Sequence, residues 1–197
     1  MHEYLYDNCR RGDSVVDDVL KNLGEIGDLW VLLGVVYSHP LAQAPWVPTR
    51  EEILPYIIML AKPTKDDVFY DLGCGDGRVV IEASLHGAKG VCVEINPELI
   101  KKAKEAAEKL KVIDRITFVN DDFFNVSLRD ATIVYMYLLT SVNRALRPKL
   151  ERELRLGARV ITLDFEIPGW RPIHIMRVSL GYREATLYLY VRGVSDI

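Results

Sequence analysis

The feature that most constrains this chain is a glycine-rich run, Asp71-Leu-Gly-Cys-Gly-Asp-Gly77, which lies between a β-rich stretch and a helical pattern. Residues 68–72 are aliphatic and aromatic apart from Asp71 and predict a short strand. Residues 78–86 predict a helix that ends at Gly87. A strand, a tight glycine loop and a helix in this order are typical of α/β proteins with a parallel sheet.

The rest of the chain continues this alternation of strands and helices. Only the short stretch 168–172 separates the fifth strand from the next β segment, so no crossover helix fits there. The last two β segments flank residues 181–184, which predict a hairpin turn. We therefore expect an α/β fold whose mostly parallel sheet ends in an antiparallel hairpin. The predicted strands after the first are 90–95, 116–119, 132–137, 159–167, 173–180 and 185–191, and the predicted helices are 96–111 and 141–156, the second interrupted or bent near Pro148.

The N-terminal part of the chain has the sequence pattern of a helical extension joined to the domain by a linker. Apolar residues recur at helical spacing over residues 14–37, and three prolines within residues 39–48 mark a linker. We expect residues 1–46 to form a helical extension with its linker and residues 47–197 to form one globular domain. The chain length of 197 residues fits one substantial core.

Composition and charge exclude several classes of protein. Hydrophobic residues make up 49% of the chain and charged residues 27%, as in ordinary globular proteins. The formal net charge of −3 gives no global attraction to polyanions, and no basic patch stands out, so we expect no nucleic-acid partner. The apolar stretch 29–37 is shorter than the roughly 20 residues needed to span a bilayer.

The cysteines and histidines show no metal-ligand or catalytic-triad spacing. We therefore expect no metal site. The odd number of cysteines and a start unlike a signal peptide predict a reducing, cytoplasmic environment. These residues are Cys9, Cys74, Cys92, His2, His39, His86 and His174.

The glycine loop suits one kind of cofactor better than another. A dinucleotide fingerprint has a small residue where this chain has Arg78, whose side chain would obstruct a pyrophosphate. Asp71 would repel a pyrophosphate but would attract an ammonium group through a charge-assisted hydrogen bond. S-adenosylmethionine carries such an ammonium group, so the loop favours this cofactor over NAD.

Two further acidic residues end successive predicted strands. Glu94 follows about 20 residues after the loop, where a carboxylate can accept both hydrogens of a ribose diol. Asp122 can accept from an adenine amino group, with Asp121 as its rival, while Phe123 offers an apolar face to the base. Together with Asp71, these groups match an ammonium, a diol and an exocyclic amine. A strand-end charge or a cap would explain each of them taken alone.

Thr49 has both a structural and a functional interpretation. Residues 49–52 fit a capping box that would begin a helix running to about Leu60, with Pro55 in an awkward interior position. A helix N-terminus near the cofactor would also favour the cofactor's carboxylate. The complete set of predicted cofactor-binding residues is Thr49, Asp71, Gly73, Cys74, Gly75, Glu94, Asp122 and Phe123.

Several stretches of the domain carry a family resemblance, which extends from Val47 to about Gly193. They are 47–49, 71–78, 93–97, 121–124, 138–143, 148–154 and 169–170. On these stretches the chain resembles the archaeal broad-specificity protein-lysine methyltransferases, which are related to the mitochondrial lysine methyltransferases of the ATP synthase and of the adenine nucleotide translocase. The glycine loop specifies only the cofactor, and the later stretches are more particular to the lysine-modifying group.

The resemblance implies a Rossmann-like class I methyltransferase fold, S-adenosylmethionine as methyl donor and protein lysines as acceptors. It implies that Asp71, Gly73 and Gly75 hold the methionine part of the cofactor, Glu94 the ribose, and Asp122 with Phe123 the adenine. The first 45 residues depart from the archaeal pattern. They leave a helical cap, a dimer element and a substrate-recognition arm open as alternatives.

The acceptor channel is expected where the fourth strand ends. Tyr137 is the candidate for contact with the incoming amine, Met136 and Leu138 for the channel, and Trp170 for its entrance. A packed aromatic core would explain Tyr137 and Trp170 equally well. An apolar channel would favour deprotonated lysine, because burial lowers the pKa of an amine.

Three other functions remain as alternatives. Methyltransferases of nucleic acids or glutamine more often carry an Asn/Asp-Pro-Pro-aromatic motif where this chain has Met136-Tyr-Leu-Leu139, which weakens that alternative. A small-molecule methyltransferase usually adds a lid or a late insertion, for which the short final strands leave little room. A module that binds the cofactor or a protein partner without turnover is the non-enzymatic alternative.

Overall fold

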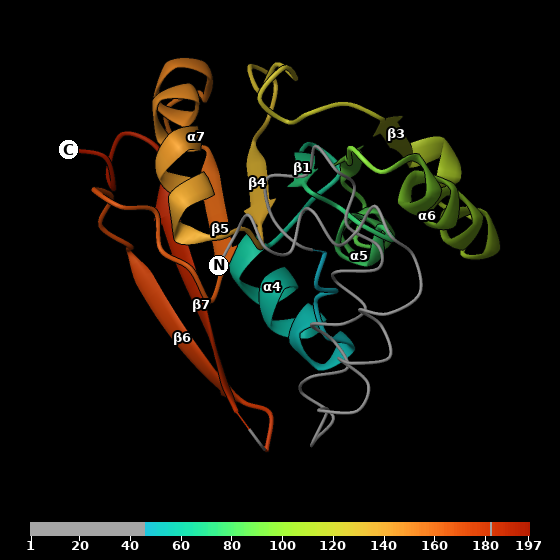
Figure 1. Ribbon diagram of the computed structural model, residues 1–197, viewed down its shortest axis with the longest axis horizontal. Coiled ribbons are helices and arrows are strands. Elements are labelled where there is room, and N and C mark those ends of the chain that lie inside the picture. Colours follow the sequence, from blue (N-terminus) through green and yellow to red (C-terminus); the bar gives the residue numbers. More distant parts are fainter. Residues whose placement is uncertain (1–45, 182) are drawn as a thin grey trace, which may run out of the picture.

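The computed structural model describes residues 46–181 and 183–197, which form a seven-stranded sheet in the order β3-β2-β1-β4-β5-β7-β6 (Figure 1). The first five strands along the chain pair in parallel, and β7 pairs antiparallel with both β5 and β6. The predicted parallel sheet with a terminal antiparallel hairpin is therefore confirmed. The strands are β1 (Val68–Leu72), β2 (Lys89–Val93), β3 (Ile116–Val119), β4 (Ile133–Met136), β5 (Arg159–Leu163), β6 (His174–Ser179) and β7 (Glu184–Val191).

Helices cover both faces of this sheet. Apolar side chains of α4, α5 and α6 pack into one buried cluster with residues such as Phe69 and Ile133 of the sheet, and α7 packs on the other face around Val134 and Met136. Strand residues alternate between these two clusters, as the pleat requires. The helices are η1 (Glu51–Ile53), α4 (Leu54–Ala61), α5 (Arg78–Leu85), α6 (Pro97–Lys109), η2 (Ile113–Arg115) and α7 (Thr140–Glu153).

Local signals placed most of these boundaries correctly. The first strand and the start of α5 fall where the sequence predicts them. Asn96 caps α6 through its side chain, which accepts from the amide of Glu98, and Pro97 is the first helical residue. The hairpin between β6 and β7 closes through a hydrogen bond from the amide of Leu180 to the carbonyl of Arg183.

The predicted capping box at Thr49 is wrong. The helical segment begins with the 3₁₀ turn η1, whose N-cap is Arg50 and has no side-chain cap. Thr49 instead shares a buried hydrogen bond of 2.8 Å with the hydroxyl of Tyr135, and Glu52 pairs with Arg50. Pro55 lies in the first turn of α4, where the missing amide hydrogen leaves no hydrogen bond unmade. A long-range partner for Thr49 thus replaced the local cap.

Two further boundaries differ from the expectation. The predicted interruption near Pro148 is absent, and α7 continues through this residue. Burial of Val142, Leu146 and Leu150 against the sheet holds the helix together on both sides of the proline. The fifth strand ends at Leu163 instead of Ile167, because Asp164 adopts the left-handed region with φ of 60°. The predicted helical extension and the prolines at 40 and 45 lie outside the described residues.

Candidate active site

The glycine-rich loop joins the carboxyl end of β1 to α5. Its amides at Gly73 and Cys74 both donate to the carbonyl of Val93, at 2.8 and 3.0 Å, so the loop is fastened to the end of β2. Gly75 has φ of 54°, and a Cβ atom there would overlap the indole of Trp46. The loop therefore needs glycine at this position for both conformation and space. Trp46 is a neighbour of the loop that the sequence did not indicate.

Asp71 lies under this loop and is only 2% exposed. Burial raises the pKa of its carboxyl to about 8, and the nearby carboxylates of Glu94 and Asp76 add to this shift. With a pKa this high, the carboxyl of Asp71 is mostly protonated at neutral pH when no cation lies beside it. The position suits a ligand that brings a positive charge.

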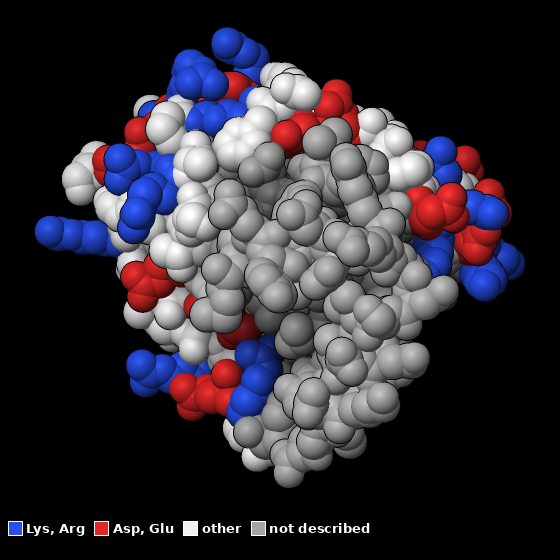
Figure 2. Space-filling model, in the orientation of Figure 1, with Lys and Arg blue, Asp and Glu red and all other residues white. Residues whose placement is uncertain are grey.

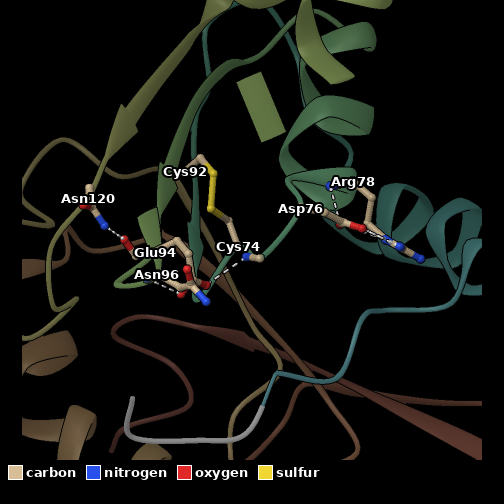
Figure 3. The surroundings of a disulfide bond; sticks show 8 residues. Cys74, Asp76, Arg78, Cys92, Glu94, Asn96 and Asn120 are labelled. Atoms are coloured by element: carbon tan, nitrogen blue, oxygen red, sulfur yellow. Dashed lines mark hydrogen bonds and ion pairs between the residues drawn. A yellow bond between two sulfur atoms is a disulfide. The ribbon is translucent and has the colours of Figure 1, made fainter. Parts of the chain in front are cut away.

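Glu94 follows β2 directly and turns its carboxylate towards the glycine loop (Figure 3). One oxygen accepts from the amide of Gly75 at 3.0 Å, and the other accepts from the amide of Asn96 at 2.9 Å. Each carboxylate oxygen has a second lone pair, so Glu94 can also accept from a ligand hydroxyl. The structure thus brings Glu94 beside Asp71 and the loop, as the sequence predicts.

A disulfide joins Cys74 of the loop to Cys92 of β2, with their Cα atoms 5.3 Å apart (Figure 3). The odd number of cysteines had indicated a reducing environment, so the sequence did not predict this bond. The register of the sheet pairs Asp71 with Cys92, which places Cys92 beside the start of the loop. Only this register could have revealed the bond.

The residues predicted for adenine follow β3. Asp122 is partly buried, and its carboxylate accepts from the amide of Phe124 at 2.9 Å. Its rival Asp121 is exposed and accepts from the amide of Asp122 and from Asn125. Phe123 is buried in the cluster beneath α7.

Asn120 lies beside this segment and donates to the carbonyls of Glu94 and Ile95, both at 2.9 Å (Figure 3). No sequence pattern indicated this bridge, because it joins the ends of two neighbouring strands.

Thr49 and Tyr135 connect the segment before η1 to the centre of the sheet. Tyr135 is fully enclosed, and burial raises the pKa of its hydroxyl, to which the charges of Asp71 and Asp164 add. Arg78 donates to the carbonyl of Thr49 at 2.8 Å, so the first residue of α5 also holds this segment. Thr49 therefore lies near the loop through its Tyr135 and Arg78 contacts and not through a helix cap.

Tyr137 follows β4 directly and is half-buried. Its hydroxyl donates to the carboxylate of Asp164 at 3.1 Å, and its ring stacks on Phe165 with centroids 6.1 Å apart. Burial and the Asp164 charge raise the pKa of Tyr137 to about 12. At neutral pH the hydroxyl stays protonated, so Tyr137 can donate and accept hydrogen bonds but is not a base.

The other residues predicted for the acceptor channel belong to the core beneath α7. Met136 is fully buried, and Leu138 is packed close to Gly73. Trp170 is 5% exposed, contacts Tyr190 edge to face and donates from its indole nitrogen to Glu151 at 3.0 Å. The structure thus fits the alternative of a packed aromatic residue for Trp170, which lies in the cluster opposite to that of Tyr135.

Comparison with known proteins identifies the family. Residues 71–174 match the family described as the ANTKMT methyltransferase domain. A protein-lysine N-methyltransferase of Saccharolobus islandicus is 46% identical over 151 residues, which cover 76% of this chain and 94% of that protein. The chain belongs to this methyltransferase family. An adenine nucleotide translocase lysine N-methyltransferase of Mus musculus is 33% identical over 137 residues, 68% of this chain and 58% of that protein.

A solved structure supports the same assignment. An RNA methyltransferase from Salinibacter ruber in complex with S-adenosyl-L-homocysteine is 40% identical, with a TM-score of 0.69, and the match covers 74% of this chain and 93% of that one. The chain is an S-adenosylmethionine-dependent methyltransferase with a Rossmann-like class I fold. The family resemblance, the fold class and the methyl donor expected from the sequence are therefore confirmed.

The described residues place limits on other sites. Within residues 46–181 and 183–197, no three or more His, Cys, Asp or Glu side chains are grouped to hold a metal ion. The same part of the chain has no helix long and apolar enough to cross a membrane. Figure 2 shows Lys/Arg and Asp/Glu side chains intermixed over α6, so this part of the visible surface carries no patch of a single sign.

Proposed function

We propose that this methyltransferase modifies the ε-amine of protein lysines. The observation that carries the proposal is the 46% identity to a protein-lysine N-methyltransferase along 94% of that protein's length. Relatives described as lysine N-methyltransferases of an ATP synthase component, 30% identical in Xenopus laevis and in Homo sapiens, point in the same direction.

The cofactor roles proposed from the sequence fit the chemistry of the loop. Asp71, buried and with a raised pKa, would pair with the ammonium group of S-adenosylmethionine, which returns the carboxyl to its ionised form. Glu94, whose carboxylate lies against the glycine loop through the amide of Gly75, would accept from the ribose hydroxyls. Asp122 and Phe123 would contact the adenine.

The cofactor supplies a methyl group bound to a positively charged sulfur. In the transfer, the lone pair of a neutral lysine nitrogen forms a bond to the methyl carbon, and the carbon–sulfur bond breaks with its electrons on sulfur. The lysine proton leaves to solvent before the attack. Since Tyr137 keeps its own proton, its role is to orient the amine. Orientation and exclusion of water are the protein's main contributions to this displacement.

The test is incubation of the purified full chain with methyl-labelled S-adenosylmethionine and a cell lysate, followed by mass spectrometry of the modified residues. We expect methyl-lysine that disappears with Asp71→Asn, which keeps the size of the side chain but removes its charge. Asp130→Asn is the matched control, because Asp130 is an exposed carboxylate that accepts from Tyr70 at 2.7 Å.

Other acceptors are outcomes of the same experiment. The Salinibacter ruber relative is described as an RNA methyltransferase, so total RNA is included as a second acceptor. Label on RNA without label on lysine would refute the proposal, and label only in the small-molecule fraction would favour the small-molecule alternative. Cofactor binding without any transfer would favour a non-catalytic module.

A further inference from the structure

Three side chains from separate elements meet at the carboxyl edge of the sheet. Tyr137 follows β4 and Asp164 follows β5, which is its parallel neighbour in the sheet. Arg183 lies in the turn between β6 and β7 and donates to the same oxygen of Asp164 as Tyr137 does, at 2.8 Å. The other oxygen of Asp164 accepts from the amide of Thr186 at 3.0 Å. All three of these neighbours donate hydrogen bonds to the carboxylate.

The surroundings hold this arrangement in one geometry. Asp164 adopts a left-handed conformation with φ of 60°, and its own amide donates to the carbonyl of Thr186 at 2.7 Å. Phe165 stacks on Tyr137, and Asn143 of α7 donates to the carbonyl of Phe165 at 3.1 Å. The hydroxyl of Tyr137 is thus fixed from the strand that it follows and from the segment after β5.

The cluster lies on the same side of the sheet as the cofactor residue Asp71. Asp71 is paired with Tyr135 in the register of β1 and β4, so their side chains share a face. Tyr137 is two residues further along and returns to that face, beyond the end of the strand. In parallel sheets this edge is where ligands bind. The hydroxyl of Tyr137 is therefore placed beside the methionine end of the proposed cofactor site.

We propose that Asp164 is a positioning residue that acts through Tyr137. This inference rests on the proposed methylation of lysine. The hydroxyl donates its only hydrogen to Asp164 and also accepts a hydrogen bond from Arg183. The phenol oxygen has two lone pairs, so the one that Arg183 does not use can accept an N–H of the substrate amine. The nitrogen lone pair then remains available for the methyl carbon. Without Asp164 the hydroxyl would donate to that nitrogen lone pair and block the attack.

The experiment compares Asp164→Gly, Tyr137→Phe and the double variant in the full chain. Glycine suits the left-handed backbone at this position. The acceptor is total lysate protein unfolded by heat, and the readouts are the maximal rate of methyl-lysine formation, the half-saturating concentration of S-adenosylmethionine, and thermal unfolding. Tyr70→Phe is the matched control, because it removes a tyrosine–carboxylate hydrogen bond to Asp130 elsewhere in the sheet.

Asp164→Gly and Tyr137→Phe should each lower the maximal rate by about ten- to a hundredfold, since a misoriented amine loses most of its reactivity. The half-saturating cofactor concentration should stay within about twofold. In the double variant, the loss of Asp164 should add less than about twofold to the effect of Tyr137→Phe, because both residues act as one unit. A merely structural hydrogen bond would also make the two effects non-additive. It would, however, lower the melting temperature and raise the half-saturating cofactor concentration together with the loss of rate, whereas a positioning role lowers the maximal rate alone.

Each result decides one hypothesis. A wild-type rate in Asp164→Gly, or effects that multiply in the double variant, would overturn the role of Asp164 while lysine methylation stands. Absence of lysine methylation by the wild-type protein would overturn the proposed function and this role with it. Should Asp164→Gly fail to fold, Asp164→Asn takes its place. Its single amide oxygen can still accept from Tyr137 but has three donors to serve, so the maximal rate should fall by less than in Tyr137→Phe, and a wild-type rate would again overturn the role of Asp164.

Discussion

The disulfide between Cys74 and Cys92 predicts a large change in stability upon reduction. It closes a segment with a sequence separation of 18 residues that holds the second half of the glycine loop, α5 and most of β2. The perturbation is the double replacement Cys74→Ser and Cys92→Ser, made in a Cys9→Ser background so that no other thiol is present. Reduction of the parent protein is the second form of the same perturbation.

The expected magnitude follows from the length of the closed segment. A cross-link over 18 residues removes unfolded-state entropy equivalent to about 3 kcal/mol at 25 °C. For a domain of this size, that loss should lower the melting temperature by roughly 6–12 °C. The loop itself should keep its shape at 25 °C, because Gly73 and Cys74 still donate to Val93 and Gly75 still donates to Glu94.

The assay is differential scanning calorimetry of the oxidised parent, the reduced parent and the serine variant. Alkylation in denaturant, read by mass spectrometry, establishes how many thiols are free before each scan. Addition of reductant to the serine variant is the control and should not shift its melting temperature. Calorimetric titration with S-adenosylmethionine at 25 °C should give affinities for the oxidised parent, the reduced parent and the serine variant that lie within a few-fold of each other.

Two results would refute this reasoning. Alkylation of Cys74 and Cys92 without reductant would show that the bond does not form in the purified protein. Equal melting temperatures, within about 2 °C, for the oxidised parent and the serine variant would show that the closed segment does not restrict the unfolded chain.

Three other perturbations test the site. Since the pKa of Asp71 is about 8 and its ionised form pairs with an ammonium, affinity for S-adenosylmethionine should rise by up to about tenfold per pH unit below pH 8. Above about pH 8 the affinity should fall again, because the α-amino group of the cofactor then loses its proton. Asp71→Asn should bind weakly and lack the rise below pH 8, by calorimetric titration. Gly75→Ala should weaken cofactor binding more than about tenfold in the same calorimetric titration, because the new methyl group overlaps Trp46 and the backbone conformation at this position favours glycine. Unchanged binding would contradict the loop geometry. Thr49→Val should lower the free energy of unfolding by about 1–3 kcal/mol in urea titrations, because it leaves the hydroxyl of Tyr135 buried without its partner. The double variant Thr49→Val with Tyr135→Phe should be less destabilised than Thr49→Val alone, because it removes that buried hydroxyl as well.

Local sequence patterns determined most of the elements and the sheet edge at which the proposed cofactor residues lie. The glycine loop after a short apolar strand predicted β1 and α5, and Asn96-Pro97 predicted the start of α6, because caps and turns depend on a few adjacent residues. Asp71 and Glu94 were found in the same way, since both stand at strand ends and parallel strands bring their carboxyl ends to one edge.

Tertiary structure alone decided which distant side chains meet. Thr49 looked like a helix cap because the sequence contains the local pattern, but its hydroxyl bonds to Tyr135, 86 residues away. The bond between Cys74 and Cys92 and the hydrogen bond between Tyr137 and Asp164 likewise depend on strand register. Register follows from the packing of whole faces against helices, and a shift by one residue would turn strand side chains such as Cys92 and Tyr135 to the other face. No short stretch of sequence contains that information.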